Sequence, residues 1–563
     1  MADRTRQRAM RLKILLLLLV IHGSIDAASS RAQRSAPAGD ISELSIIPQP
    51  TSAVRRSGRF SLSPAAVIRV DRATRRLGHV LADGIAPGLG FQLPVVTKGG
   101  ASGAIVLQTD QALSTKLGPE GYRLEVTPRR VTIRAAAPAG VFYGIQTLRQ
   151  LLPSDNLRKA PVRRIEWTIP CVSIEDRPRF AWRGMMMDTS RHFMPKEFVE
   201  KFIDLLAFHK LNTFHWHLTD DQGWRLEIRR YPRLTEIGAW RKETVVGRPA
   251  KSSTDNAYDH ERHGGYYTQD DVREIVAYAR ERFVTVVPEI EMPGHSQAAI
   301  AAYPMLGTTM TPLDVSTTWG IHQNILNPED PTIHFMQDVL IEVMELFPGR
   351  FVHIGGDEAD KTQWRESERV RARIKALGLK DEHEMQAWFT KQMDTFLAAH
   401  GRRLIGWDEI LEGGLAPGAA VMSWRGVKGG ITAAQAGHDV VMAPTTHTYF
   451  DYYQARERES EPLAIGGFLP LETVYAFEPV PSELDREAAR HVLGGQGQIW
   501  TEYIKTPKQL EYMAFPRVAA LAEALWTPSD QKNFGDFAVR LGAHLQRLRA
   551  LDVAYRPHTP ASH

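Results

Sequence analysis

Two adjacent carboxylates, Asp357 and Glu358, are the residues of this chain best suited to acid–base chemistry. They follow an apolar run of strand length at 351–354 and the pair Gly355-Gly356. Glycine lacks a Cβ, so a ligand can approach the backbone closely there and the chain can turn out of a sheet. In isolation, the two acids could also be a helix cap followed by a solvated glutamate. The rest of the sequence favours catalysis on a bound substrate.

The elements that would position this pair are short apolar segments that begin after Pro178 and have helical segments between several of them. Strands are predicted at 182–187, 213–218, 284–288, 351–354, 404–407, 420–424, 440–443 and 497–500. Helices are predicted at 196–211, 269–282, 332–347, 384–400 and 507–525. This alternation is typical of a (β/α)8 TIM barrel, which we assign to residues 178–555.

Residues 41–177 precede the barrel and predict a small α+β domain. Strands are expected at 104–108, 122–127, 131–135 and near 170–174, and a helix is expected at 141–152. No group of acids, bases or nucleophiles stands out in this stretch. We therefore expect the chemistry to reside in the barrel.

The first residues resemble an export signal. Basic residues precede an apolar run at 14–21, and small residues follow around Ala27, Ala28 and Ala32. A run this short is far below the roughly twenty residues that span a bilayer, so we predict a cleaved signal peptide at 1–32 and a disordered lead-in at 33–40. The expected location is periplasmic or secreted, without stable membrane insertion after processing. Uncleaved anchoring is the alternative.

The composition narrows the class of partner. A net charge of +4 on 563 residues gives no dense basic face, so a nucleic-acid partner is not expected. Cys171 is the only cysteine, which excludes an intrachain disulfide and a cysteine-based metal site. We expect neither a cofactor nor a metal.

Polar and aromatic side chains recur after the predicted strands. In a TIM barrel the loops after the strands form the open face, where substrates bind. The candidates, in chain order, are Arg183, Asp220, His295, Asp357, Glu358, Trp407, Trp424, Tyr449, Asp451, Trp500 and Glu502. Aromatic rings with acids between them suit a sugar, whose C–H faces pack on rings while its hydroxyls need acceptors.

The spacing of the two acids limits the mechanism for a glycoside. An ordinary retaining glycosidase uses two carboxylates about 5 Å apart on opposite sides of the sugar carbon. Consecutive residues such as Asp357 and Glu358 fit that arrangement poorly. A substrate that carries its own nucleophile removes the difficulty.

Six motifs of this chain resemble those of the family 20 glycoside hydrolases, the β-N-acetylhexosaminidases, and especially their exported bacterial members. They are WRGMMMDTSRH at 182–192, FHWHLTDDQGWR at 214–225, PEIEMPGH at 288–295, HIGGDE at 353–358, GWDEI at 406–410 and GQIWTEY at 497–503. The resemblance covers the whole barrel and extends more weakly to the domain before it.

The resemblance implies an exo-acting, retaining enzyme that releases terminal β-linked GlcNAc or GalNAc from oligosaccharides or glycoconjugates, such as chitooligosaccharides. The oxygen of the sugar's 2-acetamido group would attack C1 and form an oxazolinium-like intermediate. Asp357 would orient the acetamido N–H and stabilise its positive charge. Glu358 would act first as general acid and then as general base.

The resemblance also implies roles for the other candidates. Arg183, Asp451 and Glu502 would bind ring hydroxyls, and Tyr449 would contact the acetamido carbonyl. The three tryptophans, Trp407, Trp424 and Trp500, would enclose the acetamido methyl and the sugar face. Asp220 and His295 would form a polar relay that supports the acid.

Two other functions remain open from the residues alone. The pair His215 and His217 on one strand, with His295 and His353 elsewhere, could hold zinc as in a metal-dependent amidohydrolase. A non-catalytic glycan-binding protein could use the same barrel, because a fold does not determine a function. The preferred hexosamine, the release of a disaccharide and the oligomeric state are not determined by the sequence.

Overall fold

The structure is a computed structural model of the chain, and it describes residues 44–99 and 102–558. The predicted signal peptide at 1–32 and the lead-in at 33–40 lie outside these described residues. Within them, no helix combines the length and apolar character that crossing a membrane requires.

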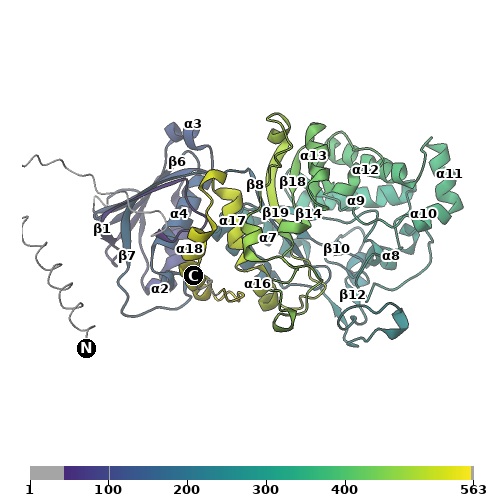
Figure 1. Cartoon of the computed structure of the whole chain (residues 1–563), viewed down its shortest axis with the longest axis horizontal. Coiled ribbons are helices and arrows are strands. Elements are labelled where there is room, and N and C mark those ends of the chain that lie inside the picture. Colours follow the sequence, from purple (N-terminus) through teal and green to yellow (C-terminus); the bar gives the residue numbers. More distant parts are fainter. Residues whose placement is uncertain (1–43, 100–101, 559–563) are drawn as a thin grey trace, which may run out of the picture. The chain divides into compact units, whose positions relative to one another are not determined.

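A seven-stranded sheet forms the first domain (Figure 1). Its strands lie in the order β1-β7-β5-β6-β4-β2-β3. They are β1 (Ser52–Ser61), β2 (Val67–Val70), β3 (Val95–Val96), β4 (Ala104–Thr109), β5 (Tyr122–Thr127), β6 (Arg130–Ala135) and β7 (Thr168–Asp176). The helices α2 (Arg75–Leu89) and α4 (Pro138–Leu151) bury apolar residues against this sheet. The four strands and the helix expected here are present as β4, β5, β6, β7 and α4.

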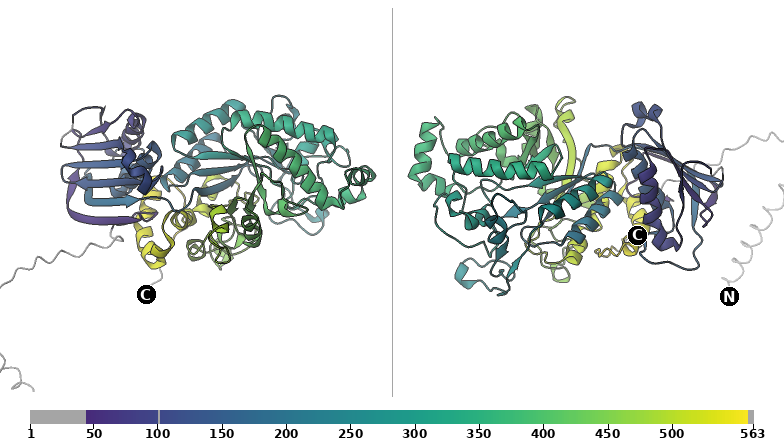
Figure 2. Two further views of the ribbon diagram at one scale, coloured as in Figure 1. Left: turned by 90° about the horizontal axis from the view of Figure 1, so that it is seen from above. Right: turned by 180° about the vertical axis from the view of Figure 1, so that it is seen from behind.

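Eight parallel strands close into a barrel in the second part of the chain (Figure 2). They are β8 (Trp182–Asp188), β9 (Thr213–His217), β14 (Thr285–Glu289), β15 (Phe351–His353), β16 (Arg403–Trp407), β17 (Ala420–Ser423), β18 (Val440–Met442) and β19 (Val492–Gly497). Neighbouring strands are in register, so that Glu289 lies beside His217 on one side and His353 on the other. The predicted fold class, a TIM barrel preceded by an α+β domain, is confirmed.

The eighth strand lies upstream of its predicted position. We expected it at 497–500, whereas β19 covers Val492–Gly497. Its middle is Gly494-Gly495-Gln496, which carries none of the β-branched or aromatic residues that mark a strand. A Cβ on Gly494 would lie 1.9 Å from the carbonyl oxygen of Trp182, so the close approach of β8 requires glycine there.

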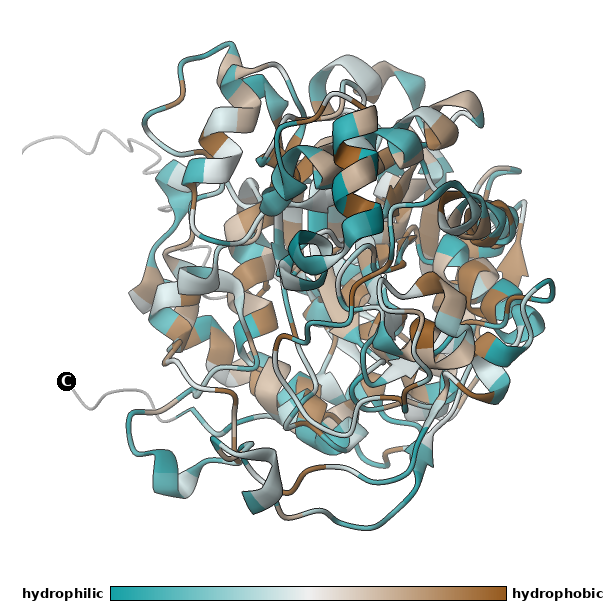
Figure 3. Ribbon diagram, turned by 90° about the vertical axis from the view of Figure 1, so that its right-hand side faces the viewer, coloured by the Kyte–Doolittle hydropathy of each residue, from teal (hydrophilic) through white to brown (hydrophobic). Residues whose placement is uncertain are grey.

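Amphipathic helices surround the barrel, and Figure 3 shows their mixture of hydrophobic residues in brown and hydrophilic residues in teal. Their apolar residues are largely buried. The longer helices are α5 (Lys196–Phe208), α7 (Gln269–Glu281), α9 (Asp330–Leu346) and α12 (Glu382–Ala399). The last helix, α18 (Phe534–Ala550), packs against the first domain. The helix predicted at 507–525 is two helices, α16 (Pro507–Ala514) and α17 (Arg517–Trp526). Pro516 has no N–H to continue a helical ladder, which accounts for the break.

Candidate active site

A cavity opens at the carboxyl ends of the barrel strands. Its lining is rich in acids and aromatic rings. The lining residues are Arg191, His295, Asp357, Glu358, Trp407, Trp424, Thr445, Tyr449, Asp451, Tyr452, Ile465, Trp500 and Glu502. All the predicted site residues except Asp220 and Arg183 are in this set, although the role of each stays a prediction.

The turn after β15 delivers the two consecutive acids to the cavity. Gly355 and Gly356 adopt φ values of +66° and +93°, and a Cβ on Gly355 would lie 1.6 Å from a carboxylate oxygen of Glu291. Glu358 itself has φ +48°, a conformation that side-chain-bearing residues seldom adopt. The side chain of Asp357 is 11% exposed and that of Glu358 is 35% exposed. The turn therefore places Asp357 deep in the cavity and Glu358 nearer to solvent.

His295 stands between the two acids and Asp220. Its Nε2 lies 3.5 Å from a carboxylate oxygen of Glu358 and 3.7 Å from one of Asp357. Its Nδ1 lies 3.3 Å from Oδ1 of Asp220, directly behind the cavity wall. Burial by itself lowers the pKa of His295, but the charge of Asp220 outweighs burial and raises that pKa well above its ordinary value. The structure thus brings Asp220, His295 and Glu358 together, and the relay between them stays a prediction.

The prediction for Arg183 is wrong. Its side chain is fully buried and does not line the cavity. It donates hydrogen bonds of 2.8 and 3.0 Å to Glu120 of the first domain and further bonds to the carbonyl oxygens of Phe180 and Lys210. Arg183 is the second residue of β8, at the opposite end of the strand from the cavity, so its side chain cannot reach a sugar.

Arg191 is the arginine that the structure places in the cavity. It lies beyond the carboxyl end of β8, and its guanidinium lies 2.7 Å from Asp220 and 5.0 Å from the ring centre of Trp500. Burial alone lowers the pKa of Arg191, yet the charges of Asp220 and Asp188 raise it well above its ordinary value. Its position just after a strand is the sequence signal that could have identified it.

Aromatic rings form the walls of the cavity. Trp407 and Trp500 have ring centres 5.9 Å apart, while Trp424 and Tyr449 stack with centres 6.2 Å apart. The indole N–H of Trp424 donates a 2.8 Å hydrogen bond to Glu409, a residue that the sequence did not single out. Burial, reinforced by the charge of Asp357, raises the pKa of Glu409 to about 8. The hydrogen bond to Glu409 thus orients the Trp424 ring.

Several buried oxygens on the cavity lining have no partner among the described residues. They are Oδ1 of Asp357, both carboxylate oxygens of Asp451 and Oε2 of Glu502. Burial and the neighbouring charge of Glu502 raise the pKa of Asp451 well above its ordinary value, and burial also raises the pKa of Glu502. Buried acceptors are costly when unpaired, so this site suits a ligand with several N–H and O–H donors.

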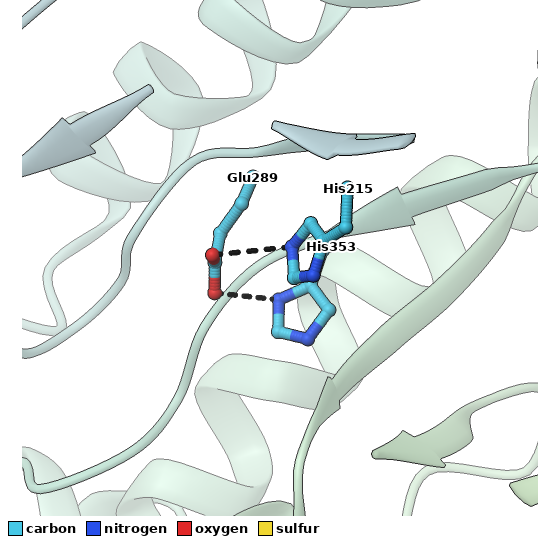
Figure 4. Close-up of side chains that lie close together, drawn as sticks. All are labelled: His215, Glu289 and His353. Atoms are coloured by element: carbon cyan, nitrogen blue, oxygen red, sulfur yellow. Dashed lines mark ion pairs between the residues drawn. The ribbon is translucent and has the colours of Figure 1, made fainter. Parts of the chain in front are cut away.

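Of the four histidines considered for a metal site, His295 lines the cavity and the other three lie in the barrel interior. His215 and His353 flank Glu289, and all three side chains are buried (Figure 4). The two ring nitrogens of His217 lie against the carboxylates of Glu289 and Asp220. Both nitrogens therefore carry hydrogens, which leaves His217 no lone pair for a metal. The His215 and His217 pair does not form the chelating site that the zinc alternative requires.

Two family models match this chain. The model described as "Glycosyl hydrolase family 20, catalytic domain" matches residues 180–529, and "Glycosyl hydrolase family 20, domain 2" matches residues 43–177. The chain belongs to glycoside hydrolase family 20. The family 20 domains thus coincide with the barrel and the sheet domain that precedes it.

Individual relatives agree with this family. A β-hexosaminidase of Porphyromonas gingivalis is 44% identical over 92% of this chain, which spans 64% of that protein's length. A solved family 20 β-N-acetylhexosaminidase of Streptomyces coelicolor A3(2) superimposes with a TM-score of 0.80 at 33% identity, covering 93% of this chain and 99% of that one. A solved Vibrio harveyi family 20 exo-β-N-acetylglucosaminidase in complex with N-acetylglucosamine superimposes with a TM-score of 0.79 at 33% identity. The match covers 95% of this chain and 81% of that one.

Proposed function

We propose that this family 20 chain is an exo-acting, retaining β-N-acetylhexosaminidase that works by substrate-assisted catalysis. The observation that carries the proposal is the arrangement of two consecutive acids in one cavity. Asp357 is buried there with a free oxygen, and Glu358 lies beside it with greater exposure. One acid can thus receive the acetamido N–H of a bound hexosamine while the other faces the glycosidic oxygen.

In the first step, the acetamido oxygen attacks C1 as the glycosidic bond breaks. Asp357 accepts a hydrogen bond from the acetamido N–H and stabilises the positive charge that develops on the ring being formed. Glu358 gives its proton to the departing oxygen. A tethered nucleophile avoids a bimolecular encounter, an advantage worth up to about 7–11 kcal/mol in favourable cases.

In the second step, water opens the oxazolinium-like intermediate. Glu358, now ionised, takes a proton from the water, which attacks C1 from the side that the aglycone left. Two displacements at C1 give a product with the original β configuration. Arg191, Asp451 and Glu502 are suited to hold the sugar hydroxyls, which supports removal of one terminal residue at a time.

The aromatic walls of the cavity and the related enzymes support the proposed substrate class. The tryptophan rings provide an apolar surface for the acetamido methyl, and the Vibrio harveyi relative was solved with N-acetylglucosamine. We therefore propose glycans with terminal β-linked GlcNAc or GalNAc as substrates. The proposed export, which rests on the sequence of residues 1–32, would bring the enzyme to glycans outside the cytoplasm.

The test compares two aryl glycosides that differ only at C2. The 4-nitrophenyl β-glycoside of N-acetylglucosamine should be cleaved at least about a thousandfold faster than the 4-nitrophenyl β-glucoside, which lacks the nucleophile. Release of nitrophenol gives kcat/KM for both. Equal cleavage of the two glycosides would contradict acetamido participation.

A further inference from the structure

A row of buried polar side chains leads from the cavity into the barrel interior and ends at Glu289. This glutamate is the last residue of β14 and is fully buried. It lies in register with His217 of β9 and His353 of β15. Since residues at one level of neighbouring parallel strands project to the same side of the sheet, these three side chains meet inside the barrel.

Each carboxylate oxygen of Glu289 accepts one hydrogen bond and lies close to a second ring nitrogen. Oε2 accepts a hydrogen bond from Nδ1 of His217 and lies 3.1 Å from Nε2 of His215. Oε1 accepts a 2.8 Å hydrogen bond from the indole N–H of Trp407 and lies 2.8 Å from Nδ1 of His353 (Figure 4). Four rings thus surround this carboxylate, and two of them donate hydrogen bonds that orient it.

His217 connects Glu289 to the predicted relay. Its Nε2 donates a 2.9 Å hydrogen bond to Oδ2 of Asp220, so the ring bridges two carboxylates as an imidazolium. Burial by itself lowers the pKa of His217, but the charge of Glu289 and its hydrogen bonds to both acids raise it to about 10. The His217 ring is therefore positively charged throughout the pH range in which the enzyme would work.

The same carboxylate of Asp220 faces His295. Its Oδ1 lies 3.3 Å from Nδ1 of His295, and Nε2 of His295 lies 3.5 Å from Glu358. Arg191 also contacts Asp220, at 2.7 Å from Oδ2. The Asp220 carboxylate is thus held by His217 and Arg191 at Oδ2 and by the backbone N–H of Asp221 at Oδ1. Nδ1 of His295 lies between the carboxylates of Asp220 and Asp221, at 3.3 Å from each.

We propose that Glu289 is a positioning residue for the reaction, acting through His217, Asp220 and His295 to hold Glu358 in place for proton transfer. The proposal rests on the function proposed above. Loss of the Glu289 charge leaves the His217 imidazolium paired with Asp220 alone, which weakens the hold on the ring. Asp220 and His295 then lose the arrangement that faces Glu358. A role confined to stability would leave proton transfer intact.

The test uses a leaving-group comparison, because only poor leaving groups need a proton from Glu358. In Glu289→Gln, we expect kcat/KM for phenyl N-acetyl-β-glucosaminide to fall at least about tenfold more than that for the 3,4-dinitrophenyl analogue. An equal loss for both substrates would overturn the proposal. The wild-type enzyme on the same substrates tests the proposed function separately.

A second variant tests the same path from Glu289 to Glu358 if Glu289→Gln does not fold. His217→Gln interrupts the same path and leaves the bond between Glu289 and Trp407 in place. It should show the same selective loss on the phenyl substrate. Where both variants fold, the double variant should lose little more than either single one, because the two residues act as one unit. Independent, additive losses would contradict a shared path.

Glu523→Gln is the matched control. Glu523 is also fully buried, and its oxygens lie 2.6 and 2.8 Å from the guanidinium of Arg540, away from the cavity. The same change of carboxylate to amide should lower the melting temperature without altering the ratio of kcat/KM between the two leaving groups. A shift of that ratio in the control would show that any buried lesion mimics the effect.

Discussion

At the scale of single residues, the two consecutive acids have different surroundings. Burial raises the pKa of Asp357, the positive charge of His295 opposes this and the charge of Glu358 adds to it, giving a value of about 6. In the proposed mechanism, Asp357 must be ionised to receive the acetamido N–H and to stabilise the charge on the new ring. Its ionisation therefore sets an acidic limit on the reaction.

We expect kcat/KM on 4-nitrophenyl N-acetyl-β-glucosaminide to fall as the pH drops through about 6. Above this pH the carboxylate is charged and active, and below it the protonated acid no longer accepts the N–H bond. Asp357→Asn should lower kcat strongly. The kcat/KM that remains in this variant should no longer fall as the pH drops through about 6, so the acidic limb of the pH profile should be absent. An unchanged limb in Asp357→Asn would show that another group titrates.

Most residues of the cavity could be predicted because each lies just beyond the carboxyl end of a strand. The rule that predicts them also shows why Arg183 was a poor choice, since it occupies the second position of β8. Arg191, three residues after that strand, satisfies the rule. Glu409, two residues after β16, satisfies the same rule and was overlooked. Only its hydrogen bond from Trp424, which follows the neighbouring strand β17, could not be predicted from the sequence.

At the scale of elements, a buried pair of histidines joins two helices. His209 follows α5 and His544 lies in α18, and their Nε2 atoms are 2.9 Å apart. Nδ1 of His209 donates to the carbonyl oxygen of Leu205, so Nε2 of His209 accepts from His544. Because Nε2 of His209 must keep its lone pair to accept this bond, His209 is neutral in the folded protein. Burial lowers the pKa of His209 to about 4 and that of His544 well below its ordinary value.

This pair should weaken the protein in acid. The unfolded histidines take up protons near pH 6.5, but the folded ones do so only at lower pH, so stability is complete above 6.5 and falls below it. For His209 the loss by pH 4 is about 3 kcal/mol at about 1.4 kcal/mol per pKa unit. His544→Gln can still donate to His209, and its free energy of unfolding in urea should fall less between pH 6.5 and 4.5. Parallel curves for variant and wild type would contradict this.

The regular elements could be predicted where their apolar pattern is strong, as in β9 and α7. The pattern fails where close packing, rather than the intrinsic strand preference of the residues, determines the structure. Gly494 and Gly495 weaken the strand signal of β19, although the barrel needs small residues there because Trp182 and Phe477 lie close by. Tertiary contacts of this kind connect distant parts of the sequence, so a local pattern does not contain them.

At the scale of the whole described molecule, buried ion pairs join the sheet domain to the barrel. Arg183 holds Glu120, and Lys210 lies 2.9 Å from Asp176 with both side chains fully buried. Breaking one partner of such a pair typically costs about 3–5 kcal/mol. Arg183 thus serves the junction at one end of the barrel, while the cavity lies at the other. Sequence alone gives no partner for Arg183, because Glu120 is 63 residues away.

The nucleophile itself can be tested by changing the substrate rather than the protein. Replacing the N-acetyl group of the 4-nitrophenyl glycoside by mono-, di- and trifluoroacetyl groups makes the carbonyl oxygen progressively less nucleophilic. If this oxygen attacks C1, kcat/KM should fall at each step, by roughly a thousandfold or more over the series. If a carboxylate or water attacks instead, the four substrates should react at similar rates, and substrate-assisted catalysis would be excluded for this enzyme.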